Sequence, residues 1–206
     1  IKGIQQPICT KKPHRMEMHG DVRVDDYYWL NDRENSEVID YLNEENNHTK
    51  AVMADTEEFQ KSLFAEMVAR IKHDDASVPY FLNGYWYYTR FNEGQEYTVF
   101  CRKKQSLESD EIILLDVNVL GKDKAFCQIG GMSISPDNKR LAYSVDFQSR
   151  RIYTVYFKDL ETDELLSQTI ENTTGGATWA NDNETLFYAT KDKKTLRSDT
   201  IRRYFI

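Results

Sequence analysis

The fold of this chain is decided by one stretch, Ser133-Ile134-Ser135-Pro136-Asp137-Asn138-Lys139-Arg140-Leu141-Ala142-Tyr143-Ser144-Val145-Asp146. Its pattern predicts a strand, a tight turn and a second strand. Pro136 sets φ for the first corner of a turn, and Asp137 and Asn138 tolerate the bridge and left-handed conformations that follow. The second half alternates apolar residues with small or polar ones, as half-buried strands do.

The same pattern returns 45 residues later, where Asp182 and Asn183 correspond to Asp137 and Asn138. Leu186 likewise corresponds to the first apolar residue of the second strand. Repeats of about 40–50 residues that contain several short strands are typical of β-propeller blades. The repeat therefore predicts a propeller, with an ordinary antiparallel sandwich as the alternative.

Composition sets the class of protein. The chain has 206 residues, of which 40% are hydrophobic and 30% charged, as in a globular protein with a core. No apolar run approaches the ~20 residues of a membrane helix. The net charge of -7 argues against a nucleic-acid partner. No leader-like segment is present, and Cys9, Cys101 and Cys127 lack metal or disulfide spacing. We therefore expect free thiols and a cytoplasmic location, with the periplasm as the alternative.

Residues 1–76 are predicted to form an irregular arm, through residue 35, followed by two helices. In the arm, Tyr27, Tyr28 and Trp29 are expected to dock on a core. A metal site is the competing interpretation, but its candidates show no ligand spacing, and no metal site is predicted. Those candidates are His14, His19, Asp21, Asp25 and Asp26.

The two helices carry recognisable end signals. Asn35 or Ser36 is predicted to cap the first, and Asp55 with Glu58 resembles a capping box for the second. The second helix has a wide apolar stripe that two helices alone cannot bury. The stripe consists of Phe59, Leu63, Met67 and Ile71, with Phe64 and Val68 beside them.

Residues 77–206 have strand periodicity and are predicted to form the first two to three blades of the propeller. The expected strands are 84–91, 96–102, 111–117, 132–135, 140–146, 152–159 and 165–170, with a third blade from about 177. The last blade is incomplete at Ile206, and unpaired strand edges are avoided in natural folds. We therefore expect the chain to be the front portion of a longer protein, and the isolated chain to self-associate.

Motifs along the whole chain resemble the prolyl oligopeptidase family of serine peptidases, in particular its oligopeptidase B branch. They include Lys12-Pro13-His14, His19-Gly20-Asp21, Asp25-Asp26-Tyr27-Tyr28-Trp29-Leu30, Asp74-Asp75-Ala76-Ser77-Val78-Pro79, Tyr88-Thr89-Arg90 and Ser149-Arg150-Arg151-Ile152-Tyr153. The resemblance implies an enzyme in which a seven-bladed propeller caps an α/β-hydrolase domain and limits entry to short peptides. It also implies that the N-terminal helices pack on that domain, and that oligopeptides are cleaved after Arg or Lys.

The catalytic residues of that chemistry are not predicted in this chain. A Ser on a Gly-x-Ser-x-Gly elbow, a His and a carboxylate are needed. The nearest match, Gly131-Met132-Ser133-Ile134-Ser135, lacks the closing Gly, so Ser133 is interpreted as a strand residue. The histidines all precede the propeller, whereas the family's catalytic His lies near the C-terminus; they are His14, His19, His48 and His73. We therefore assign no catalytic, cofactor-binding or metal residue.

A hypothesis from another class remains open, namely a non-catalytic propeller that serves as a protein-interaction module. Composition does not separate the two. A downstream reading frame with further blades and a Gly-x-Ser-x-Gly elbow would favour the peptidase, and its absence would favour the module.

Overall fold

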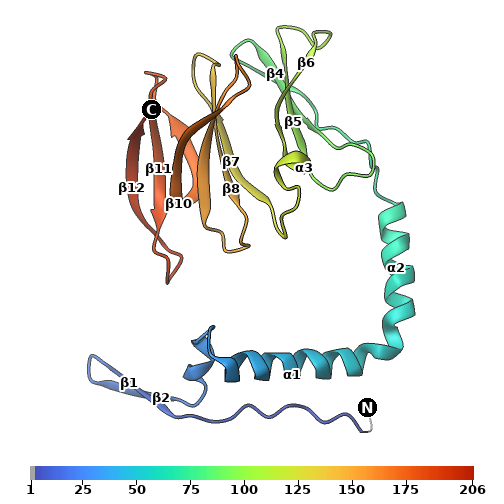
Figure 1. The fold of residues 1–206 in the computed structure, drawn as a ribbon, viewed down its shortest axis with the longest axis vertical. Coiled ribbons are helices and arrows are strands. Elements are labelled where there is room, and N and C mark those ends of the chain that lie inside the picture. Colours follow the sequence, from blue (N-terminus) through green and yellow to red (C-terminus); the bar gives the residue numbers. More distant parts are fainter. Residues whose placement is uncertain (1–2) are drawn as a thin grey trace. The chain divides into compact units, whose positions relative to one another are not determined.

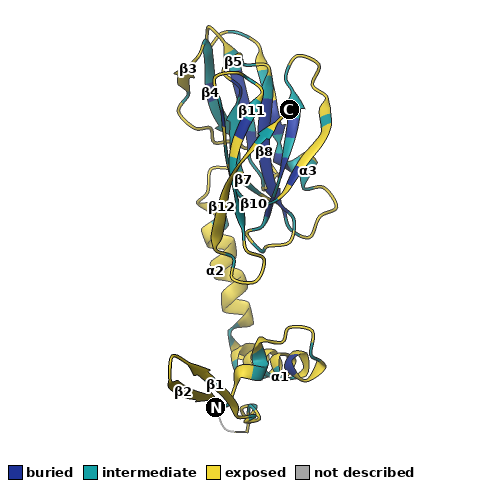
Figure 2. Cartoon of the chain, turned by 90° about the vertical axis from the view of Figure 1, so that its left-hand side faces the viewer, coloured by how far each residue is buried: buried dark blue, intermediate teal, exposed yellow. Residues whose placement is uncertain are grey.

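The computed structural model describes residues 3–206, which fall into two compact units. The first unit is Ile1–Ile71 and the second is Lys72–Ile206. Figure 2 shows that the dark blue, buried positions concentrate in the strands of the second unit, whereas helix α2 of the first is mostly exposed. The second unit therefore holds the core that the strand pattern predicts.

The first unit begins with a hairpin that the sequence pattern did not reveal. Its strands β1 (His14–Met18) and β2 (Asp21–Asp25) pair antiparallel, although residues 1–35 were expected to be irregular. The two-residue turn is His19-Gly20, with φ of 53° and 81°. Two positive φ angles match the twist of a hairpin, and Gly20 adopts one at no steric cost. The expectation that residues 1–35 are irregular was therefore wrong for residues 14–25.

Two helices complete the first unit, α1 (Ser36–Met53) and α2 (Glu57–Ala69). The predicted Asn35 cap is confirmed, because its Oδ1 accepts the Glu37 amide at 2.9 Å. The capping box at Asp55 is wrong. A 3-10 turn joins the helices, so the backbone stays helical and the N-cap, Thr56, donates its hydroxyl to Met53 O at 2.6 Å instead. Within residues 3–206, neither helix is long and apolar enough to span a bilayer.

The N-terminal arm is fastened by Trp29. Its indole Nε1 donates to Thr10 O at 2.9 Å, and the Lys12 ammonium lies 4.5 Å from its ring centroid. Tyr28 stacks on His14 at 4.1 Å, yet the side chains of both Tyr27 and Tyr28 remain more than 40% exposed. Of the aromatic cluster expected to dock, Trp29 is the residue that ties the arm to its own unit.

The second unit consists of two antiparallel sheets, drawn side by side in Figure 1. The four-stranded sheet has the order β3-β4-β5-β6, and the six-stranded sheet has the order β12-β11-β10-β9-β8-β7. The bounds are β3 Tyr80–Leu82, β4 Tyr85–Arg90, β5 Val99–Lys104, β6 Glu111–Asp116, β7 Gln128–Ile134, β8 Arg140–Asp146, β9 Tyr153–Asp159, β10 Leu165–Trp179, β11 Thr185–Lys191 and β12 Ser198–Phe205, with a short helix α3 at Val117–Leu120. The strand order is that of successive propeller blades, each a meander, which confirms the predicted fold class.

Strand β10 belongs to two blades. Its first part pairs with β9 as the outer strand of the second blade, and its last residues pair with β11 as the inner strand of the third. The sequence predicted two separate strands here. The chain instead bends at Gly175, where φ is +98°, and its carbonyl accepts the Ser144 hydroxyl at 2.6 Å. Only glycine adopts such a φ without strain, so the strand turns without ending.

The central strand β8 is buried on both faces. Leu141, Tyr143 and Val145 pack toward the first blade, in a cluster with Tyr87 and Leu115. On the opposite face, Ala142 belongs to a second cluster, toward the third blade, whose other buried members are Val155, Phe157, Ile170, Trp179 and Leu186. Side chains alternate across a strand, so β8 contributes to both cores. These two cores hold the three blades together.

Candidate functional site

The main cavity of the second unit lies between the first blade and strand β7. Its volume is about 500 Å³, within the range of small-ligand pockets. Its walls combine apolar and aromatic side chains with uncharged polar ones, among them two asparagines, three serines and Thr89. The apolar part is formed by Tyr80, Leu82, Tyr87, Phe100, Leu114, Met132 and Ile134, and the polar part by Asn83, Asn138, Ser77, Ser133 and Ser135. The lining contains no His, Asp, Glu, Lys or Arg side chain, so it is suited to binding an uncharged or apolar group.

An ion-pair network occupies the other face of the first blade. Arg90 donates to Glu111 through Nη2 at 2.7 Å and through Nε at 3.0 Å, and the Tyr88 hydroxyl donates to the same carboxylate at 2.5 Å. The hydrogen bonds from Arg90 lower the pKa of Glu111 to about 2. Burial, and then the bond to Glu111, raise the pKa of Tyr88. These groups are locked in one protonation state near neutral pH, which is a structural arrangement rather than a catalytic one.

Two of the three cysteines, Cys101 and Cys127, are buried thiols. Cys101 is buried, and burial raises the pKa of its thiol to about 12. Burial also raises the pKa of Cys127. A thiol is nucleophilic only as thiolate, so neither residue is prepared for covalent catalysis.

The serine and histidines of the sequence analysis are not brought together. Ser133 lies in β7, as expected, and its carbonyl accepts the Trp179 indole at 2.9 Å. His14 and His48 lie in the first unit, in β1 and α1. No serine hydroxyl bonds a histidine ring in the part of the chain that the structure describes. Nor does that part contain a group of three or more His, Cys, Asp or Glu side chains arranged to hold a metal.

Helix α2 presents a bare apolar face. Four of its large apolar side chains, and Ile71 just beyond its end, are between 41% and 69% exposed; the four are Phe59, Leu63, Phe64 and Met67. The stripe was identified from sequence by its i, i+4 spacing. The cavity and the Arg90–Glu111 pair were missed, because they join residues on different strands and carry no local signal.

Comparison with known proteins gives the family. Residues 7–205 match the prolyl oligopeptidase N-terminal β-propeller domain. The chain belongs to this family. The match includes both the helical segment and the blades, which confirms the resemblance inferred from the motifs.

Relatives of the chain are peptidases. It is 43% identical to dipeptidyl aminopeptidase BI of Pseudoxanthomonas mexicana over 97% of its length, and 35% identical to protease 2 of Moraxella lacunata over 91%. The structure resembles that of oligopeptidase B from Leishmania major, with a TM-score of 0.89 and 31% sequence identity. The matched region covers 99% of this chain and 31% of the Leishmania chain. The chain spans only 30% and 28% of the two curated relatives.

Proposed function

We propose that this chain is the N-terminal part of a serine oligopeptidase that cleaves short peptides after Arg or Lys, with the propeller limiting substrate size. The observation that carries the proposal is the family match over residues 7–205 together with peptidase relatives about three times as long. The chemistry of the second unit supports a propeller that limits substrate size while another part of the longer protein performs the catalysis. The Arg90–Glu111 pair is held in one protonation state and the thiols of Cys101 and Cys127 have raised pKa values, so we assign this unit the role of shaping and binding rather than reacting.

The bare face of α2 supports a second part of the proposal. An exposed stripe of five large apolar side chains exceeds what a soluble surface usually carries without a partner. We propose that this face packs on the α/β-hydrolase domain of the longer protein. Burial of such a helix face contributes stability in proportion to the apolar area removed from water.

A second candidate function concerns the mode of cleavage. The 43% identical relative is named a dipeptidyl aminopeptidase. By that similarity, the longer protein would release dipeptides from a free N-terminus instead of cleaving inside a peptide. The two activities share the serine mechanism and differ in whether the substrate's N-terminus must be free.

The deciding experiment uses the protein encoded by the whole reading frame that contains this chain. Reporter peptides with Arg or Lys before the scissile bond are tested in two forms, one with a blocked N-terminus and one with a free N-terminus. Cleavage of the blocked reporter, abolished by a serine-directed acylating inhibitor, supports the oligopeptidase. Cleavage of the free reporter alone supports the dipeptidyl activity, and cleavage of neither supports the non-catalytic interaction module. The purified 206-residue chain is the control, and we expect it to be inactive.

A further inference from the structure

The first turn of each blade carries an asparagine in the left-handed conformation. Asn83 lies between β3 and β4, Asn138 between β7 and β8, and Asn183 between β10 and β11, with φ of 48°, 65° and 64°. Asparagine is one of the few residues that adopts this conformation readily. The three residues therefore occupy equivalent positions in three successive blades.

The side chains of two of these asparagines bind the preceding blade. Asn138 Nδ2 donates to Asn83 O at 3.2 Å. Asn183 Oδ1 accepts the Asp137 amide at 2.8 Å. In both cases the side chain in the first turn of one blade bonds the backbone of the first turn of the blade before it. The turns thus form a chain of hydrogen bonds that runs from blade to blade.

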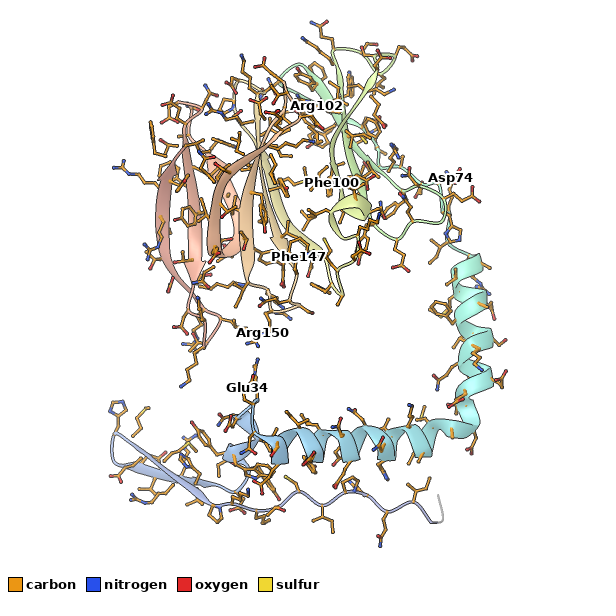
Figure 3. All side chains as sticks on the ribbon, viewed as in Figure 1. Glu34, Asp74, Phe100, Arg102, Phe147 and Arg150 are labelled. Atoms are coloured by element: carbon orange, nitrogen blue, oxygen red, sulfur yellow. The ribbon has the colours of Figure 1, made fainter. Side chains whose placement is uncertain are left out.

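An arginine of each blade makes the complementary contact with the next. Arg102 Nη1 of the first blade donates to Asn138 O at 3.2 Å, and Arg140 Nη1 of the second donates to Asn183 O at 3.0 Å. Arg102 is buried, stacks over the Tyr85 ring at 4.1 Å and is seen on β5 beside Phe100 in Figure 3. Hydrogen bonds from a charged donor are about twice as strong as neutral ones. Each junction is therefore specified by two contacts.

The first blade lacks both contacts on its preceding side. Within residues 3–206 the Asn83 side chain makes no hydrogen bond, and no arginine donates to its carbonyl. The face of this blade that points away from β7 also carries partly bare apolar groups, Phe81 and Ile113, at 53% and 42% exposure. Register places both on the side of the Arg90–Glu111 pair, since Phe81 pairs with Trp86 and Ile113 with Cys101. That face of the first blade therefore resembles the side of a blade that another blade would cover.

We propose that Asn83 closes the propeller ring, by binding the first turn of the last blade, a segment of the longer protein C-terminal to Ile206. The Asn83 side chain bonds the backbone of that turn, and an arginine of the last blade donates to Asn83 O. The peptidase relatives contain the additional chain, since this one spans 30% of their length. The inference rests on family membership and not on peptidase activity.

Photo-crosslinking in the protein of the whole reading frame tests the contact. A benzophenone amino acid replaces Asn83, and mass spectrometry identifies the peptide to which it couples. We expect coupling within one chain to the first turn of the last blade. The matched control replaces Asn138, and it should couple to the turn around residue 83. Coupling from position 83 only to residues 1–206, to a second copy, or to nothing while the control couples, would overturn the proposal.

Thermal melting gives a second readout that does not depend on the photoreactive group. Asn83→Gly, Asn138→Gly and Asn183→Gly each remove the side chain and keep the left-handed conformation. In the longer protein we expect all three variants to lower the Tm by similar amounts. An Asn83→Gly variant of the longer protein that melts like the wild type, while Asn138→Gly and Asn183→Gly melt at lower temperature, would contradict the ring-closing contact.

Discussion

Replacing Glu111 by Gln tests whether the Arg90–Glu111 pair stabilises the first blade. Lowering a carboxyl pKa from 4.5 to about 2 corresponds to roughly 3 kcal/mol in favour of the charged form. Both side chains are 27% exposed, so solvent screens the pair, and a loss of about 1–2 kcal/mol is the reasonable expectation. For a domain of this size that loss lowers Tm by about 2–8 °C at neutral pH.

The pH dependence of the difference identifies its cause. The folded pKa of Glu111 is depressed, so its contribution is complete above the unfolded value and is lost as the pH falls from 4.5 toward 2. The Tm difference between the wild-type chain and Glu111→Gln should therefore shrink as the pH is lowered from about 7 to about 3. Melts are recorded at one protein concentration, because association changes Tm.

The matched control is Glu108→Gln, which removes an exposed carboxylate that makes no ion pair within residues 3–206. We expect its free energy of unfolding to change by no more than about 0.5 kcal/mol. If Glu111→Gln and the wild-type chain melt in parallel, with the same separation at every pH, the carboxylate charge does not stabilise the fold and the reasoning is refuted.

Three further predictions follow from the packing. Gly131→Ala places a Cβ 2.6 Å from Gly175 O and should lower the stability of the chain by about 1–3 kcal/mol. The control is Gly176→Ala, whose Cβ meets nothing within 4 Å. Equal melting temperatures for the two variants would show that β7 and β10 move apart at no cost, against this prediction. In the longer protein, Phe59→Ala and Leu63→Ala should each cost about 2–5 kcal/mol, measured by melting; no loss in either would place the α2 face in solvent. The isolated 206-residue chain should aggregate or pair with a second copy in size-exclusion chromatography with light scattering, because its strand edges and the α2 face are open; a stable, cooperative monomer would contradict this.

Local signals in the sequence predicted much of the second unit. The bounds of β8 agree with the prediction, and Asn138 and Asn183 have the left-handed conformation expected of their turns. These features depend on neighbours in the chain, through turn chemistry and alternation. The blade order then follows from repeating the same short pattern.

What the sequence did not predict depends on distant residues or on competing patterns. The β1–β2 hairpin was missed because each strand has only five residues, too few for their alternation to stand out from the arm around them. The sequence pattern predicted one strand that ends at residue 170 and a new one from about residue 177, whereas β10 runs through both. The junction contacts of Arg102 join strands more than 30 residues apart, so no window along the chain contains both partners.

The strand shared by the second and third blades has a consequence for how the protein opens. Because β10 is hydrogen-bonded to β9 at one end and to β11 at the other, losing it disrupts both blades at once. Within residues 72–206, all of which the structure describes, no strand of the first blade pairs with one of the second, and the contact between these blades is made by side chains and turns. Amide exchange should therefore report two cooperative units, with the second and third blades exchanging together. The boundary between these two units lies beside β7, and we expect local opening of the blades to begin there.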